Sequence, residues 1–250
     1  YLYYVKGDDM FKNKINLLAS LLLICSTTAF AGITGSPHDL SANTLLDSNS
    51  SDNGEICVYC HTPHAANTAF DGAPLWNKAT PAGTFTMYGS TMAGTATAAT
   101  PASPSLACLN CHDGVSAIDS IVNAPGSGSN SIAGSIDITE IGVTYGGNIG
   151  ESNGTVSNLA NDHPVSITYN EGTAGLRLKT FDLTSYGDTV AWTGADTVGD
   201  LLRGAGSDQV ECGSCHDPHN GGKTQGVDTE VNFLRHSNTN SNLCIGCHDK

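Results

Sequence analysis

The sequence has too few large apolar side chains for a hydrophobic core of the usual kind. Aromatic residues make up 6% of its 250 residues, whereas Gly alone contributes 29. Residues 82–102 and 123–161 are rich in small and polar residues and show few periodic apolar positions. Stretches of this kind are typical of linkers or disordered segments. Packed amphipathic helices or alternating strands are therefore not expected to supply most of the buried surface.

Basic residues are also scarce. The 10 Lys and Arg stand against 24 Asp and Glu, which gives a formal net charge of −14. Counted after residue 31, the numbers are 7 and 22, and the charge is −15. This balance argues against binding to nucleic acid or to anionic lipid. We interpret the acidity as a source of solubility rather than as the mark of a specific partner.

Long hydrophobic runs are absent apart from one near the N-terminus. It spans residues 15–24, which is too short for a membrane-spanning helix. Lys12 and Lys14 precede this run, and Ala29-Phe30-Ala31 follows it as a small-x-small cleavage site. This order of features is typical of a secretory signal peptide.

The domain organisation follows from that leader. We expect Met10 to be the initiator, residues 1–9 to be upstream translation, and residues 10–31 to be the signal peptide, so that the leader covers 1–31. The mature chain is then 32–250, exported and without a membrane span.

Nine cysteines stand out against this background. Cys25 lies in the leader after the bulky Ile24, a poor match to a lipoprotein site. The other eight form four Cys-x-x-Cys-His pentapeptides, which are Cys57-Val58-Tyr59-Cys60-His61, Cys108-Leu109-Asn110-Cys111-His112, Cys212-Gly213-Ser214-Cys215-His216 and Cys244-Ile245-Gly246-Cys247-His248. No cysteine of the mature chain is left for a disulfide or a free reactive thiol.

The pentapeptide is the attachment signature of c-type haem. Its two sulfurs form thioethers to the porphyrin vinyl groups, and the histidine that follows ligates the iron on the proximal side. A bare Cys-x-x-Cys is equally a redox or zinc motif, but four copies, each followed at once by His, favour haem. The sequence therefore predicts four haem c groups, with His61, His112, His216 and His248 as proximal ligands.

This prediction also explains the composition. We expect a haem-nucleated fold of a multihaem cytochrome c, mostly coil, with short helices near the motifs and few strands. One strand pair is expected around 165–169 and 176–183, where apolar and polar residues partly alternate. Export agrees with the chemistry, because haem c is attached outside the cytoplasm.

An internal repeat organises the motifs. Each half of the mature chain contains a lone His, then Cys-x-x-Cys-His-x-Pro-His, then Cys-x-x-Cys-His-Asp. The first copy consists of His38, 57–64 and 108–113, and the second of His163, 212–219 and 244–249. We therefore expect two dihaem halves, about 32–122 and 155–250, joined by a Gly/Ser/Asn-rich stretch.

Each half thus supplies two histidines beyond its proximal pair. The predicted distal ligands are His38, His64, His163 and His219, which make all four irons bis-histidine. His236 is left over, and we expect it in a solvent-facing turn after Phe233-Leu234-Arg235. The alternative axial ligands are Met87 and Met92, which would raise the reduction potential.

The His-x-Pro-His spacing restricts which iron each distal histidine can reach. Residues three apart on a turn lie close together, about 5–6 Å between Cβ atoms. Thr62-Pro63 and Asp217-Pro218 could each cap and begin a short helix. His64 would then have to pass around a whole porphyrin to reach the far face of the haem beside it. We expect His64 and His219 each to ligate a different haem that packs close by.

The chain resembles the doubled-CxxCH multihaem c-type cytochromes, and most closely the OmcE-type tetrahaem extracellular cytochromes of metal-reducing bacteria. The matching segments are 35–41, 56–66, 74–76, 108–114, 163–165, 212–219 and 233–235. The resemblance implies bis-histidine haems and filaments with a continuous haem stack, in which a neighbouring subunit donates one distal histidine. His236 is extra relative to that ligand pattern.

Three functions remain open. We expect an extracellular or cell-surface electron conduit, polymerised from copies of itself, that exchanges electrons with other redox proteins or extracellular acceptors. The first alternative is a monomeric shuttle in the periplasm or at the surface. The second is a multihaem reductase, which needs an iron with an open position. Five spare histidines face four distal positions, so no vacancy is required and we do not expect an enzyme.

His38 is the distal histidine that we expect to cross a subunit boundary. It lies six residues after Gly32, on an arm with Gly35 and Pro37 and little to bury. Such an arm is poorly tied to its own domain. The alternative is that His38 ligates a haem of its own chain.

Overall fold

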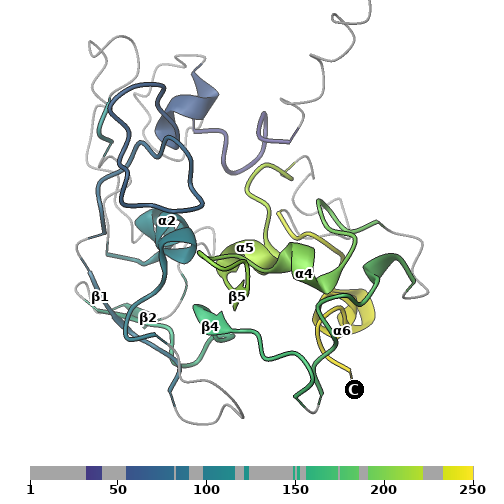
Figure 1. Ribbon diagram of the computed structural model, residues 1–250. Coiled ribbons are helices and arrows are strands. Elements are labelled where there is room, and N and C mark those ends of the chain that lie inside the picture. Colours follow the sequence, from purple (N-terminus) through teal and green to yellow (C-terminus); the bar gives the residue numbers. More distant parts are fainter. Residues whose placement is uncertain are drawn as a thin grey trace, which may run out of the picture.

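The computed structural model describes residues 32–40, 55–81, 83–89, 98–115, 121–123, 149, 151–152, 156–173, 175–185, 191–221 and 233–249 (Figure 1). The expected leader, Met92 and most of the polar stretch 123–161 lie outside these residues. Among the described helices, none is long and apolar enough to cross a membrane.

Short helices carry the pentapeptides. They are η1 (Ile56–Tyr59), α2 (Ser103–His112), α5 (Cys212–Cys215) and α6 (Asn242–Ile245). The other described helices are η3 (Leu183–Ser185), α4 (Val198–Leu201) and η4 (Thr239–Ser241). Pro104 stands in the first turn of α2, where its missing N–H costs no hydrogen bond. The prediction of short helices near the motifs agrees with this arrangement.

Two small sheets complete the regular structure. In the first, β1 (Thr84–Thr86) runs parallel to β3 (Val156–Asn158), and β2 (Glu151–Ser152) pairs with β3 in the antiparallel sense. In the second, β4 (Ile167–Thr168) pairs antiparallel with β5 (Gln209–Val210). The first sheet therefore ties β1 of the first half to the last part of the central polar stretch, which contains β2 and β3.

The expected pairing of 165–169 with 176–183 is wrong. Ile167 and Thr168 do form a strand, but their partner is β5, which immediately precedes the third pentapeptide. Leu176 instead makes an isolated bridge with His248 of the fourth pentapeptide. The partly alternating apolar and polar residues in 176–183 reflect side-chain burial, since Leu176, Phe181 and Leu183 all pack in the main apolar cluster. Burial alone does not specify a strand partner.

The apolar core is small and lies mainly in the second half of the chain. Its buried members are Tyr169, Leu183, Trp192, Ala195, Val198, Leu201 and Leu202. A smaller cluster in the first half contains Phe70, Ala73 and Ala107, with Trp76 and Leu106 packed against it. The coil-rich fold with few helices and strands agrees with the composition.

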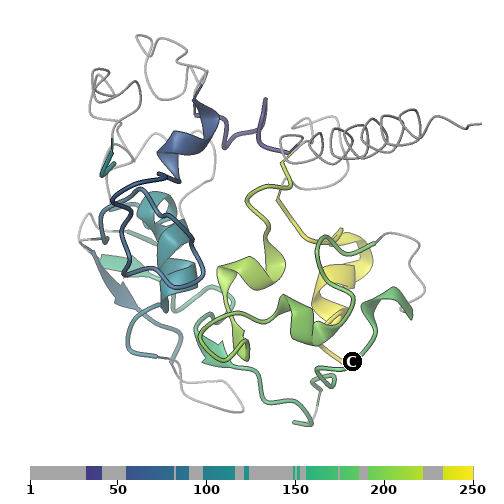
Figure 2. The same cartoon turned by 45° about the horizontal axis from the view of Figure 1, so that its top comes forward.

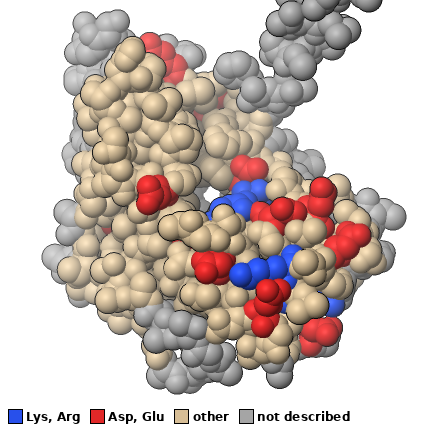
Figure 3. Space-filling model, in the orientation of Figure 1, with Lys and Arg blue, Asp and Glu red and all other residues tan. Residues whose placement is uncertain are grey.

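The molecule has two parts that meet at α5 and β4. In both ribbon views, α2 and β1 lie on one side and α4 and α6 on the other (Figures 1 and 2). The space-filling view shows a hollow between the parts (Figure 3). Charged side chains gather over the second-half part on this face, whereas the first-half part is nearly uncharged (Figure 3).

A buried hydrogen-bonded junction joins the two parts. Glu211 is 1% exposed and precedes α5 as its N-cap. Its carboxylate accepts hydrogen bonds from the Ser105 hydroxyl of α2 and, at 3.0 Å, from the Ser166 hydroxyl. The Ser105 hydroxyl in turn accepts from the backbone N–H of Cys212 at 3.1 Å. Burial raises the pKa of Glu211. This junction sets the second and third pentapeptides side by side.

Glu211→Ala should lower the free energy of unfolding of the haem-loaded protein by about 2–4 kcal/mol, because it leaves buried hydroxyls of Ser105 and Ser166 without their acceptor. Guanidinium unfolding followed by circular dichroism measures this loss. Asp71→Ala removes a carboxylate that is exposed and should stay within about 0.5 kcal/mol of the parent. Equal effects of the two substitutions would contradict a special role for the junction.

Candidate functional site

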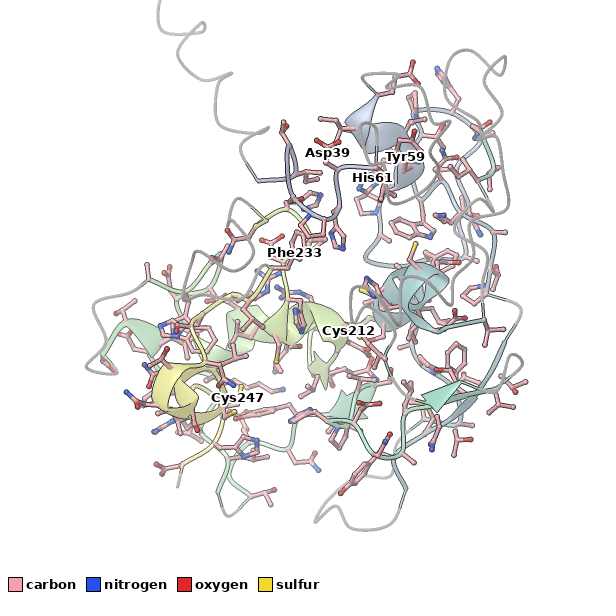
Figure 4. The ribbon with its side chains drawn as sticks, turned by 180° about the vertical axis from the view of Figure 1, so that it is seen from behind. Asp39, Tyr59, His61, Cys212, Phe233 and Cys247 are labelled. Carbon is pink, nitrogen blue, oxygen red and sulfur yellow. The ribbon has the colours of Figure 1, made fainter. Side chains whose placement is uncertain are left out.

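The four pentapeptides lie next to one another in chain order. Cys60 of the first is within electrostatic reach of Cys111 of the second. Cys108 lies close to Cys212 of the third, and this neighbour raises the pKa of Cys108 and lowers that of Cys212. Cys215 is within electrostatic reach of Cys244 and Cys247 of the fourth. Figure 4 shows the same order, with His61, Cys212 and Cys247 following one another across the molecule.

Three of the predicted proximal histidines lie close to a predicted distal histidine. The ring centroids of His38 and His112 are 6.0 Å apart, and those of His61 and His219 are 6.2 Å apart. The rings of His163 and His248 are 6.4 Å apart. Each pair joins one pentapeptide histidine to one histidine from outside the pentapeptides.

This spacing fits a shared metal ion. With a metal–nitrogen bond of about 2 Å on each side and a ring centre about 1 Å behind each nitrogen, two imidazoles on one metal have centroids roughly 6 Å apart. The angles between the ring planes are 56°, 17° and 72°. A range of angles is allowed, because each ring can rotate about its bond to the metal. The residues present therefore fit iron held between two axial histidines.

Hydrogen bonds orient several of these rings through Nδ1. That of His61 lies 2.7 Å from the Pro74 carbonyl, and that of His163 lies 3.0 Å from the Pro164 carbonyl. Nδ1 of His219 lies 3.5 Å from the Asp217 carboxylate, which raises the pKa of His219. An Nδ1–H held by an oxygen leaves Nε2 free for a metal, the usual arrangement of ligating histidines.

His38 is well tied to its own chain. Its ring stacks on Phe233 with a centroid distance of 4.0 Å, and its Nδ1 lies 3.4 Å from the Pro218 carbonyl. Gly32, at the start of the arm, accepts a hydrogen bond from Gly221 N at 2.8 Å. Burial and the neighbouring His112 lower the pKa of His38 to about 4. The structure therefore favours the alternative in which His38 serves a site of its own chain.

His64 and His216 differ from the other six histidines of the predicted ligand set. Neither has another imidazole at the spacing of the three pairs within the described part of the chain. Both are exposed. Pro63 and Pro218 begin no helix. Instead Asp217 accepts from His219 N at 3.0 Å and Thr62 approaches His64 N at 3.5 Å, so each His-x-Pro-His segment is a turn.

His236 is buried, not solvent-facing as expected. It is 4% exposed, and its ring stacks on Trp192 at a centroid distance of 4.6 Å and an angle of 25°. Its Nδ1 lies 3.0 Å from the Ser237 carbonyl. A face-to-face stack on an indole gives His236 a packing role and places it apart from the histidine pairs.

Lys78 is a functional candidate that the sequence analysis missed. It is the only basic residue between Lys14 and Arg177, and it is 1% exposed. Burial raises the pKa of the Cys60 thiol to about 12 and also raises that of Cys111, and the Lys78 charge opposes both shifts. Its isolation in an acidic sequence was the available signal, because a lone cation there is not needed for solubility.

Comparison with known families supports the interpretation of the pentapeptides as haem c attachment sites. Residues 205–250 match the family described as the doubled CXXCH motif. The matched segment contains the third and fourth pentapeptides and supports a multihaem c-type cytochrome with covalently bound haem c that acts in electron transfer. No curated protein matches the chain.

His219→Ala should give one more high-spin haem than the oxidised parent protein under the same conditions, because it removes the ring opposite His61. His236→Ala should leave the low-spin signals unchanged and lower the stability by about 1–3 kcal/mol, because it removes a buried stack on Trp192. Electron paramagnetic resonance and thermal unfolding separate the two effects. A high-spin signal from His236→Ala alone would show that the ligand set is wrong.

Proposed function

We propose that this chain is a tetrahaem c-type cytochrome that transfers electrons outside the cytoplasm as the subunit of a filament. The observation that supports it most directly is the histidine pattern: three motif histidines each lie about 6 Å from a histidine outside the motifs, and His64 and His216 are left over. Bound haem supplies a one-electron couple between ferric and ferrous iron. The chain holds the haems covalently and brings its four motifs into contact in sequence order.

The internal repeat indicates how the fourth pair forms. The pairs His38–His112 and His163–His248 are equivalent under the repeat, since each joins the lone histidine of a half to its own Cys-x-x-Cys-His-Asp motif. The pair His219–His61 is of another kind, because His219 reaches from the second half to the motif of the half before it. Its counterpart under the repeat is His64 with His216.

A second copy of the chain can complete the pair of His64 with His216. If each His-x-Pro-His histidine serves the half that precedes it, His64 of one copy serves His216 of the copy before. The contact is head-to-tail, and such a contact builds an open helical filament when its rotation does not close. The fourth iron is then ligated by two chains, which couples haem ligation to assembly.

The surface around His64 suits such a contact. Leu75 is 54% exposed and Val122 is 47% exposed. Leu75 O accepts from Thr62 N at 2.8 Å, and Asn123, which follows Val122, donates its side-chain amide to His64 O at 3.0 Å. Leu75 also has a φ of +56°, an uncommon conformation for a bulky residue. We define His64, Leu75 and Val122 as the His64 surface.

Further support comes from the expected leader and from the uneven charge of the surface. The first-half part is nearly uncharged on the face of Figure 3, whereas the second-half part carries most of the charged side chains. Export places the haem-loaded chain where it can meet other redox proteins or extracellular acceptors. The bis-histidine pattern favours an electron carrier over an enzyme. The alternative of a reductase concerns one iron only. The iron bound by His216 would be open to substrate if no neighbouring copy supplied His64.

His64→Ala should abolish filaments and leave soluble monomers with three low-spin haems and one high-spin haem. His38→Ala should also give one high-spin haem but keep filaments, because its partner His112 belongs to the same chain. Electron microscopy and electron paramagnetic resonance of the purified haem-loaded variants measure both properties. Filaments in His64→Ala would rule out the proposed contact. A high-spin haem in native, assembled protein would favour the reductase.

Leu75→Asp should raise the protein concentration required for filament assembly at least tenfold, because it places a charge in the apolar His64 surface. Leu178→Asp is the matched control, since Leu178 is 57% exposed and lies in the other half. Sedimentation over a concentration series measures assembly. The haem spectra of both monomers should equal the parent's. Equal assembly of the two variants would place the contact elsewhere.

A further inference from the structure

The same pair of hydrogen bonds recurs on three of the four pentapeptides. On the first, Asn77 donates its backbone N–H to the Cys60 carbonyl at 2.8 Å and its side-chain amide to the Val58 carbonyl at 2.6 Å. Cys60 is the second cysteine of the motif, and Val58 is the residue after the first cysteine. Asn77 is fully buried.

Arg235 repeats this geometry on the third pentapeptide. Its backbone N–H donates to the second cysteine, Cys215, at 2.9 Å, and its Nε donates to the Gly213 carbonyl at 2.8 Å. Gly213 occupies the same motif position as Val58.

Arg177 does the same on the fourth pentapeptide. Its backbone N–H donates to the Cys247 carbonyl at 2.9 Å, and its Nε donates to the Ile245 carbonyl at 2.8 Å. Arg177 precedes its motif in the chain, whereas Asn77 and Arg235 follow theirs. A local sequence repeat therefore cannot account for the recurrence.

The residue before each of these donors bridges to the motif histidine. The isolated bridges are His61 with Trp76, His216 with Leu234, and His248 with Leu176. A dipeptide of one apolar residue and one side-chain donor thus lies along each of the three pentapeptides. The second pentapeptide lies inside the ten-residue helix α2, whose own backbone hydrogen bonds hold its shape.

We propose that Asn77, Arg177 and Arg235 are positioning residues that hold three pentapeptides in one conformation and so fix the direction in which each proximal histidine is presented. We call them the clamp residues. The proposal rests on the proposed function only in requiring haem c at these motifs. It does not depend on the filament.

The carbonyls that the clamp residues bind explain why they are needed. The last carbonyls of a helix lack partners within it, and α5 and α6 are each a single turn. Gly213 and Ile245 lie in these turns, so an unclamped carbonyl could turn toward other donors. Arginine side chains bind terminal helix carbonyls favourably. The two hydrogen bonds therefore fix the backbone immediately before the histidine.

Both arginines also engage the aspartate that follows the histidine. Arg235 lies 3.6 Å from Asp217, and Arg177 lies 3.3 Å from Asp249. Arg235 further donates to the Thr193 carbonyl at 2.8 Å, and Arg177 lies over the Phe181 ring at 4.2 Å. Each guanidinium thus bridges the backbone before its histidine to the side chain after it, which restrains the histidine from both sides.

The test compares Arg235→Met and Arg235→Lys with Arg203→Met in the oxidised, haem-loaded protein. Arg203 is a matched control, because it lies beside Gly213 but donates to the Asp200 and Leu202 carbonyls. Electron paramagnetic resonance reports the orientation of axial imidazoles. Both Arg235 variants should shift the g-values of one signal, that of the haem at His216, whether it is low-spin with His64 of a second copy or high-spin without it, and leave the other three signals unchanged. Arg203→Met should shift none.

Two outcomes would overturn the proposal. Unchanged g-values with a lower melting temperature would show that Arg235 only stabilises the fold. A change of midpoint potential in Arg235→Met alone, with g-values unchanged in both variants, would show that its charge matters and its hydrogen bonds do not. Should Arg235→Met fail to fold, Arg235→Lys with Arg177→Lys decides the matter by the same signals. Haem content distinguishes a failed clamp from a failed proposed function, which would show as a parent protein without four haems.

Discussion

The contact between α2 and α5 is the interaction on which the arrangement of the site depends. A buried carboxylate at Glu211 accepts from Ser105 and Ser166, and Ser105 accepts from the N–H of Cys212. A buried carboxylate is costly unless it is hydrogen-bonded, so this set of partners specifies one relative position of the two helices. With α2 and α5 in contact, the two halves present their motifs as a single series rather than as two separate pairs.

The pairing of the histidines follows from that series. His219 lies in the turn after the third motif, and the junction brings this turn within reach of His61 in the other half. The arm that carries His38 docks on the same turn through Pro218 and Phe233 and thereby reaches His112. Two sites of the first half therefore depend on residues of the second half. A stable isolated first half is not expected, because it would lack those contacts.

Few cations serve the site in this acidic chain, and those few are placed at the motifs. Lys78 is close to thiols of the first two motifs, Arg235 to the third and Arg177 to the fourth. A positive charge near a haem disfavours the oxidised form and raises the reduction potential. The two arginines thus combine a structural role, through hydrogen bonds to motif carbonyls, with an electrostatic one.

The sequence by itself predicted the chemistry, because covalent haem attachment requires a fixed spacing of neighbouring residues, and this spacing is visible in the sequence. The short helices at the motifs and the coil-rich fold followed from the same spacing and from the scarcity of apolar residues. The partner of 165–169, the burial of His236 and the docking of the His38 arm did not follow, because each depends on residues far away in the chain. The clamp residues were hidden for the same reason: Asn77, Arg177 and Arg235 share only a preceding apolar residue, and they become equivalent only where the backbone brings their donors to the same two carbonyl positions. Which histidine faces which motif was likewise decided by the tertiary structure, since spacing can exclude the nearest haem but only the packing of α2 on α5 selects the one that is reached.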